Sequence, residues 1–229
     1  MLLWNPSKKY SFLKKNKRNL FNFNLLALNM TKPYEVKNER KAEHPIDKMF
    51  LERWSPRSIS HENFTEKDLF SLIEAARWTP SSSNVQPWRF IYTMHNSKEW
   101  NKFYDLLDDF NNIWCKTAGA LIVLISKKTS DDGKPYKLNS FSAGSAFMSL
   151  AFQARMKNLI AHGMQGFDYE KARKVLNIPE DFSVECMIAL GSQGKVEELH
   201  ERMQKSEKPN QRKPFKEIAN KGQFPKDWK

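Results

Sequence analysis

Two arginines and a serine at alternating positions have the chemistry to bind a phosphate group. Arg53, Ser55 and Arg57 lie in the segment Arg-Trp-Ser-Pro-Arg. A guanidinium group meets a phosphate with two parallel N–H donors, and a serine hydroxyl adds another donor. The segment therefore predicts a phosphate site. The alternative is a solvated basic turn, which the segment taken alone favours.

A polar loop between Pro80 and Pro87 has a composition suited to binding a ring. It carries three serines, an asparagine and a glutamine, and no acid, base or cysteine. Pro80 cannot donate a backbone hydrogen bond, so it ends the preceding helix. Pro87 predicts that Gln86 is extended and that a strand follows. A stiff loop of this kind suits an isoalloxazine or a pyrimidine, but it could also be a turn whose polar side chains bond to the local backbone.

The sequence lacks the signatures of acid–base, nucleophilic and metal catalysis. It has no Gly-x-Ser-x-Gly elbow, P-loop or Gly-x-Gly-x-x-Gly motif, and no metal-ligand spacing. Cys115 and Cys186 lie in apolar surroundings, and His162 is predicted to lie at a turn or a helix end. The predicted heterocycle- and phosphate-binding segments occur without any acid–base, nucleophilic or metal-binding signature. This combination indicates that a cofactor performs the reaction.

Length and composition predict a folded, non-membrane protein. The chain has 229 residues, of which 40% are hydrophobic and 13% aromatic. Its longest apolar run, 120–125, is too short to span a bilayer. The net charge of +12 favours anionic partners, but no basic–aromatic face or nucleic-acid-binding signature accompanies it. The presence of only two cysteines fits a reducing compartment, so we expect a cytoplasmic protein. From the short apolar run and the missing nucleic-acid signature, we expect neither a membrane nor a nucleic acid as partner.

The basic charge is concentrated at the N-terminus. Residues 1–30 hold six of the lysines and arginines and no acid, which is half of the net charge. This leader lacks a secretory h-region and the Ser/Arg-rich balance of a transit peptide. Met30 could be the true start of the folded protein. We expect residues 1–40 to form a poorly ordered extension and residues 41–229 to form one domain.

Helices and short strands alternate irregularly, which favours an α+β domain over a regular βαβ series. Thr65 and Asp68 form a capping-box pattern that predicts a helix over about 66–78. Further helices are predicted at about 46–53, 97–107, 141–159 and 169–176, the second capped by Ser97 and the last by Asp168. Strands are predicted at 90–93, 120–125 and 184–190. Segments 105–114 and 127–140 have the composition of loops.

Five segments, in this order, resemble the FMN-dependent nitroreductase family. They are Arg53–Arg57, Pro80–Trp88, Trp114–Ala118, Met164–Asp168 and Arg212–Pro214. The resemblance covers roughly residues 45–220. It implies a nitroreductase-like α+β fold, with a central mixed, mostly antiparallel sheet flanked by helices. It also implies a homodimer with two FMN sites at the subunit interface.

The resemblance assigns cofactor-binding roles residue by residue. Arg53 and Ser55, with Trp54 between them, would hold the FMN phosphate together with Arg212. Arg57 would lie near the flavin N1/O2 edge, Asn111 would bond to the ring, and Gln165 and Gly166 would lie along one ring face. Residues of the loop would contact the partner subunit's flavin: Pro80, Ser81, Ser82, Asn84 and Gln86.

The implied function is NAD(P)H-dependent reduction of nitroaromatics, quinones or similar electron-poor acceptors. Hydride would pass in a ping-pong scheme through FMN, with NADH or NADPH as co-substrate and no catalytic side chain. Alternatives are a flavin-binding module that senses redox state without turnover, and a specialised member such as a reductive dehalogenase. Gln165 and Trp114 replace the glutamate and lysine of many members, which alters the field around the flavin.

Overall fold

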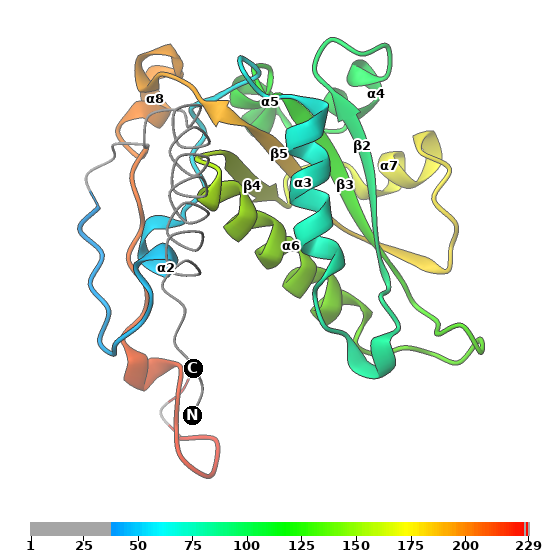
Figure 1. Cartoon of the computed structure of the whole chain (residues 1–229), viewed down its shortest axis with the longest axis vertical. Coiled ribbons are helices and arrows are strands. Elements are labelled where there is room, and N and C mark those ends of the chain that lie inside the picture. Colours follow the sequence, from blue (N-terminus) through cyan, green and yellow to red (C-terminus); the bar gives the residue numbers. More distant parts are fainter. Residues whose placement is uncertain (1–37, 227, 229) are drawn as a thin grey trace, which may run out of the picture. The chain divides into compact units, whose positions relative to one another are not determined.

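A computed structural model describes residues 38–226 and 228 of the chain (Figure 1). These residues belong to one compact unit, Glu35–Lys229. The predicted extension, residues 1–40, lies outside the described residues except for its last three.

One antiparallel sheet organises the described residues. Strand β5 pairs with β3, β4 and β1, and β3 also pairs with β2, so the main order is β1-β5-β3-β2. All of these pairings are antiparallel, which agrees with the predicted mostly antiparallel sheet. The strands are β1 (Ile59–Ser60), β2 (Trp88–Met94), β3 (Ala120–Lys127), β4 (Ile160–Met164) and β5 (Phe182–Gln193).

Strand β3 is apolar over residues 120–125 because both faces of the sheet are covered there. Leu121, Val123 and Ile125 belong to one hydrophobic cluster. The alternate residues of the strand, Ala120, Ile122 and Leu124, belong to another cluster. Side chains of a strand point alternately to opposite faces, so a strand buried on both sides loses the usual polar alternation. The predicted strand at 120–125 is confirmed.

Helices cover both faces of this sheet. Figure 1 shows α3 (Glu66–Arg77) and α6 (Asn139–Met156) side by side on one face, and both contribute to the same hydrophobic cluster. Residues of α4 (Trp100–Tyr104), α5 (Asp109–Cys115) and α7 (Tyr169–Val175) pack in the cluster on the other face. The α+β class is therefore confirmed. The shorter elements are α2 (Lys48–Glu52), α8 (Glu201–Gln204), η1 (Ser82–Asn84), η2 (Val196–Glu198) and η3 (Phe215–Glu217).

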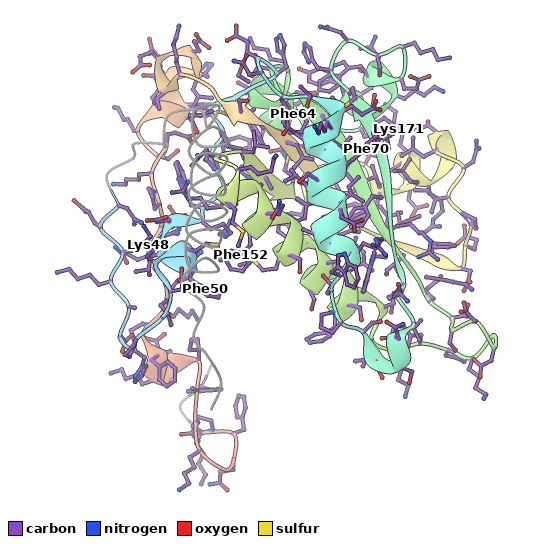
Figure 2. The ribbon with its side chains drawn as sticks, in the orientation of Figure 1. Lys48, Phe50, Phe64, Phe70, Phe152 and Lys171 are labelled. Carbon is purple, nitrogen blue, oxygen red and sulfur yellow. The ribbon has the colours of Figure 1, made fainter. Side chains whose placement is uncertain are left out.

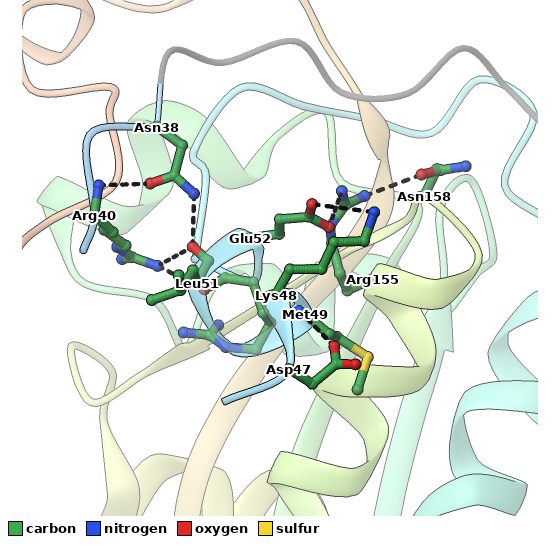
Figure 3. Close-up of polar contacts among 10 residues, drawn as sticks. Asn38, Arg40, Asp47, Lys48, Met49, Leu51, Glu52, Arg155 and Asn158 are labelled. Atoms are coloured by element: carbon green, nitrogen blue, oxygen red, sulfur yellow. Dashed lines mark hydrogen bonds and ion pairs between the residues drawn. The ribbon is translucent and has the colours of Figure 1, made fainter. Parts of the chain in front are cut away.

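Helix α2 is fixed to α6 by a polar and an aromatic contact. Glu52 forms an ion pair with Arg155 at 3.0 Å, seen in Figure 3. Phe50 packs edge-on against Phe152, with ring centroids 4.8 Å apart, and Figure 2 labels both side chains. Arg53 directly follows the last residue of α2. These contacts therefore fix the backbone position of the first predicted phosphate-binding arginine.

Several local predictions were wrong. His162 lies in strand β4 and not at a turn, because Ile160–Met164 pairs with β5. Segment 105–114, predicted to be a loop, contains most of α5. The side chain of Asp108 caps this helix by accepting a hydrogen bond from the Asn111 backbone N–H. The Ser97 hydroxyl bonds to Thr93 and does not cap α4.

The prediction for Gln86 was also wrong. This residue has a φ of +50° and is not extended, although it precedes a proline. Its backbone N–H donates to the Ser81 hydroxyl at 2.9 Å, and its side-chain amide donates to the Asn84 carbonyl at 3.0 Å. These two bonds close the loop on itself and hold a backbone angle that the local preference disfavours.

The capping box of α3 gives a first test of the fold. Thr65 Oγ1 accepts from the Asp68 backbone at 3.2 Å, and Asp68 Oδ2 accepts from the Thr65 backbone at 3.2 Å. Thr65→Ala should lower the free energy of unfolding by about 1 kcal/mol, because one orphan N–H at the helix start loses its acceptor. Urea denaturation followed by circular dichroism measures this change. Thr65→Ser keeps the hydroxyl and should stay near wild type; equal losses would assign the effect to the threonine methyl group.

Candidate functional site

A cavity of about 280 Å³ gathers five cationic side chains from three parts of the chain. Arg53 and Arg57 come from the segment between α2 and β1, and the lining includes Ser55 and Trp54. The C-terminal segment supplies Lys208 and Arg212, and Arg40 comes from before α2. No acidic side chain lines this cavity. The cavity thus brings together the four predicted cofactor-binding residues of segment 53–57 and the predicted phosphate ligand Arg212.

The segment 53–57 is held where helix α2 ends. The Arg53 backbone N–H donates to the Met49 carbonyl at 2.9 Å, and Arg53 itself has extended angles. Its guanidinium Nη1 lies 3.4 Å from the Ser55 hydroxyl. The helix therefore terminates at Arg53, and the arginine and the serine share one side of the cavity.

Glu207 fixes the C-terminal segment to this wall. Its Oε1 accepts from the backbone N–H groups of Arg57 and Ser58 at 2.7 and 2.8 Å, and from the Ser58 hydroxyl at 2.8 Å. The side chain is only 7% exposed. Gln193 adds a donor to the Ser58 hydroxyl at 2.6 Å. Sequence reasoning missed Glu207, because nothing distinguishes it from the other charges of a charged tail.

Arg40 makes a second connection between the same segments. Its Nε donates to the Asn210 carbonyl at 2.7 Å, and its Nη1 donates to the carbonyls of Arg53 at 2.8 Å and Leu51 at 3.1 Å. Figure 3 shows Arg40 beside Leu51 at the end of α2. The arginine thereby bridges helix α2 and the C-terminal segment. Sequence reasoning missed it because it falls in the predicted extension.

The cations of the cavity destabilise one another. Burial lowers the pKa of Arg53, and the nearby charge of Arg212 lowers it further. The pKa of Arg40 is lowered by burial, then by Arg212 and Arg53. Arginine stays charged regardless. The Nε of Arg57 is buried without a hydrogen-bond partner. A cavity with clustered charges and an unused donor is electrostatically complementary to an anion.

His162 also lines this cavity, although the sequence did not suggest it. Its Nδ1 lies 2.8 Å from the Pro56 carbonyl oxygen, so Nδ1 carries the proton and Nε2 keeps a lone pair. The pKa of His162 is lowered to about 4, mainly by burial; the Pro56 bond opposes this shift, and the charges of Arg57 and Arg53 contribute to it. Trp114 packs on the ring with centroids 4.6 Å apart. The imidazole is therefore neutral at pH 7.

A second group of predicted residues is joined to His162 through Trp114. Trp114 is buried, and its Nε1 donates to Asn111 Oδ1 at 3.1 Å. Asn111 Nδ2 donates in turn to the Gly166 carbonyl at 2.9 Å. A Cβ at Gly166 would collide with the side chains of Asp108 and Asn111, so only glycine fits there. Asn111 and Gly166 are therefore adjacent, with Gln165 exposed beside them.

The predicted ring-binding loop does not line the cavity. Figure 1 shows η1, which contains Ser82 and Asn84, at the opposite end of the sheet from α2 and α8. Three non-glycine residues of the loop have positive φ: Ser83, Asn84 and Gln86. The side chains of Pro80, Ser82 and Asn84 are exposed. A strained, self-bonded loop that presents polar groups outward has the features of a recognition segment.

Other chemistries find little support in the described residues. Burial raises the pKa of the Cys186 thiol to about 12 and raises that of Cys115 as well, so both sulfurs stay protonated. No group of three His, Cys, Asp or Glu side chains among residues 38–226 is placed to hold a metal ion. Within the same part of the chain, no helix is both long and apolar enough to cross a bilayer.

The fold and the basic cavity are those of a flavoprotein-like oxidoreductase domain, and comparison with known proteins gives the family. Residues 51–192 match the Nitroreductase family, so this chain belongs to that family. Its members are oxidoreductases, and the chain is therefore an oxidoreductase enzyme.

Relatives cover most of the chain. The oxygen-insensitive NADPH nitroreductase of Helicobacter acinonychis (strain Sheeba) is 27% identical over 218 residues, which are 80% of this chain and 95% of that protein. A solved structure described as an oxidoreductase containing FMN is 37% identical, with a TM-score of 0.79, and covers 84% of this chain and 99% of its own. A nitroreductase family protein from Clostridium difficile 630, 22% identical with a TM-score of 0.61 over 79% of this chain and all of its own, shares the fold.

The buried imidazole predicts a specific acid sensitivity. The pKa of His162 is lower in the fold than its ordinary 6.5, so its contribution to stability is complete above pH 6.5 and is lost as pH falls toward about 4. The loss can reach roughly 3 kcal/mol, because each pKa unit corresponds to about 1.4 kcal/mol. His162→Asn lacks this titration, so its stability relative to wild type should improve between pH 7 and pH 4.5 in urea unfolding. An equal gap between His162→Asn and wild type at the two pH values would contradict the assignment.

Proposed function

We propose that this protein is an FMN-dependent oxidoreductase that takes electrons from NADPH or NADH and reduces nitroaromatics, quinones or similar electron-poor acceptors. The observation that carries the proposal is the cavity that gathers five cationic side chains, among them Arg53 and Arg212, beside the Ser55 hydroxyl. The names of two relatives that match most of the chain, an NADPH nitroreductase and an oxidoreductase containing FMN, support the donor and the cofactor.

The residues of the cavity fit the phosphate end of FMN. A phosphomonoester carries close to two negative charges at neutral pH and three strong acceptor oxygens. Arg53, Arg212 and the Ser55 hydroxyl would bind these oxygens. Arg57 has an unused buried Nε donor and would face a carbonyl edge of the ring. The cavity volume of about 280 Å³ is at the lower limit of whole-ligand pockets, about 300–1,000 Å³, so other residues must cover the ring.

We infer that a second copy of the chain supplies part of that cover. No residue of the loop with Ser82 and Asn84 lines the cavity of its own protomer, and Figure 1 shows the turn that follows α3 apart from α2 and α8. In a homodimer this loop would reach the cofactor of the partner. Helices α3 and α6 also expose large apolar side chains, with Trp78 after α3 75% exposed and Phe141 on α6 74% exposed. Gly144 on α6 has no atom within 4 Å of an added Cβ, so its backbone can be approached closely.

The protein's own part in the reaction is binding and electrostatics. Bound FMN supplies a ring nitrogen that accepts a hydride from NAD(P)H and donates it to an acceptor. Arg57 would provide positive charge beside the ring edge where electron density increases. Asn111 and Gly166 would fix one side of the ring, which leaves the other face for donor and acceptor in turn and gives ping-pong kinetics. His162, being neutral, adds no competing charge.

We also infer that the enzyme acts in the cytoplasm. Its two cysteines, Cys115 and Cys186, are free thiols, and no disulfide stabilises the described residues. A reducing compartment is consistent with this usage.

The first test is flavin binding and reduction. The purified protein should take up FMN, turn yellow, and bleach when NADPH or NADH is added without oxygen. Arg212→Ala should weaken FMN affinity by about ten- to a hundredfold, because charge-assisted hydrogen bonds to the phosphate are lost. Fluorescence quenching of FMN measures the affinity.

The control for that variant is Lys174→Ala, which removes an exposed positive charge on α7, outside the cavity. It should bind FMN as wild type does. A protein that takes up no FMN would contradict the proposal. FMN binding without reduction by either nicotinamide would instead identify a flavin-binding module without turnover.

The second test asks whether each site uses two protomers. A variant with Arg53→Ala and Arg212→Ala loses the cavity, and a variant with Ser82→Leu and Asn84→Leu loses the loop. Each homodimer should fail to hold FMN. A heterodimer of the two, isolated through two different affinity tags, contains one intact site, because the two halves of a site come from different chains. It should bind about half the wild-type FMN.

No recovery in the heterodimer would place both halves in one protomer. Unchanged FMN binding by the Ser82→Leu, Asn84→Leu homodimer would show that the loop is only a turn. Size-exclusion chromatography with light scattering confirms that each variant remains a dimer.

A further inference from the structure

His162 gives the cation-lined cavity a hydrogen-bond acceptor. The five cationic side chains there can only donate hydrogen bonds. His162 lines the same cavity, and its Nδ1 proton is committed to the Pro56 carbonyl at 2.8 Å. The remaining ring nitrogen, Nε2, therefore has a lone pair and no proton. A ligand in this cavity meets donors for its anionic group and one aromatic acceptor beside them.

The surroundings of the imidazole keep it in this state. One face of the ring packs on the buried indole of Trp114, which is itself bonded to Asn111. The charges of Arg53 and Arg57 oppose protonation, and burial has the larger effect in holding the pKa at about 4. Strand β4 fixes the backbone of His162 through its pairing with Ala189 of β5. The acceptor is therefore held in place before any ligand arrives.

We propose that His162 Nε2 accepts a hydrogen bond from a hydroxyl that lies a few bonds from the phosphate of the bound ligand. The cavity would then select polyol phosphates over plain alkyl phosphates. The proposal rests on the proposed function in one respect: for FMN, the hydroxyl would belong to the ribityl chain that joins phosphate and ring. No sequence motif assigns His162 this role.

The expected discrimination follows from the cost of an unpaired group. When a ligand without a hydroxyl fills the cavity, it displaces water from Nε2 and leaves this acceptor without a hydrogen bond. A site that hydrogen-bonds a ligand hydroxyl strongly rejects an analogue without that hydroxyl. An apolar pocket rejects an analogue with an added hydroxyl less strongly. The loss for one neutral acceptor corresponds to about a tenfold change in affinity.

Two small probes separate this effect from phosphate binding. Glycerol 3-phosphate and 1-propyl phosphate share the phosphate and the three-carbon chain, and only the first has hydroxyls. Calorimetric titration of the flavin-free protein at pH 7.5 should show about a tenfold preference for glycerol 3-phosphate. In His162→Phe the two affinities should become equal, because 1-propyl phosphate no longer displaces water from an acceptor to which it cannot donate.

His95→Phe is the matched control. Burial also lowers the pKa of His95, but this residue lies outside the cavity, with its ring stacked on His61 at 4.0 Å. The variant should keep the preference for glycerol 3-phosphate. A similar loss of preference in both variants would assign the effect to general destabilisation and overturn the proposal.

A measurement on the wild-type protein covers the case in which His162→Phe does not fold. In protein labelled with ¹⁵N-histidine, the His162 Nε2 resonance should lie further upfield in the glycerol 3-phosphate complex, where a hydroxyl donates to it, than in the 1-propyl phosphate complex. If neither small probe binds, FMN is the probe. A downfield shift of the Nε2 resonance at saturation, which marks the loss of a hydrogen bond, then overturns the proposal.

The outcomes also separate this inference from the proposed function. A protein that prefers glycerol 3-phosphate but does not bind FMN would retain the role of His162 and lose the flavin assignment. A protein that binds FMN and shows equal affinity for the two probes would keep the flavin assignment and exclude the hydroxyl bond to His162.

Discussion

The candidate site depends on holding like charges together against their mutual repulsion. Besides burial, the charge of Arg212 lowers the pKa values of Arg53 and Arg40, and Arg53 also lowers that of Arg40, so their proximity costs free energy in the ligand-free protein. Directed hydrogen bonds maintain it: Arg40 donates to carbonyls of α2 and of the C-terminal segment, and Glu207 accepts from the backbone after Arg57. An anion would relieve this repulsion, so affinity for a phosphate is prepared by the fold before binding.

The sheet supplies the rigidity that these bonds need. Strand β5 carries β3 on one side and pairs with β4 and β1, so Gln193 and His162 are fixed by ladders that bury both faces. The Glu52–Arg155 ion pair fixes α2 to α6 and thereby the start of segment 53–57. A partly buried pair of this kind serves position more than stability, because desolvation offsets much of its attraction. The cavity thus takes its geometry from the core elements together with the bonds of Arg40 and Glu207.

Features that depend on a short stretch of neighbouring residues could be predicted from the sequence. The capping box of Thr65, the buried strand at 120–125 and the phosphate-type segment 53–57 are readable within a few residues, and the structure has the helix, the strand and a cavity at the segment. His162, Glu207 and Arg40 were missed, because their bonds join residues 106, 149 and 170 positions apart. His162 was also hidden by the glycine beside it, which reads as a turn until β5 is present as a partner.

The proposed division of the site between two chains has an energetic consequence. In the proposed dimer, the cavity of one chain and the loop of the other meet only across the interface, so a bound cofactor contacts both subunits. A ligand that binds the dimer better than the monomer must stabilise the dimer by the same free energy, since linkage is reciprocal. Cofactor loss and dissociation would then occur together. The positive φ angles of Ser83, Asn84 and Gln86 fit this view, because a loop whose function lies in another subunit gains nothing locally from its strain.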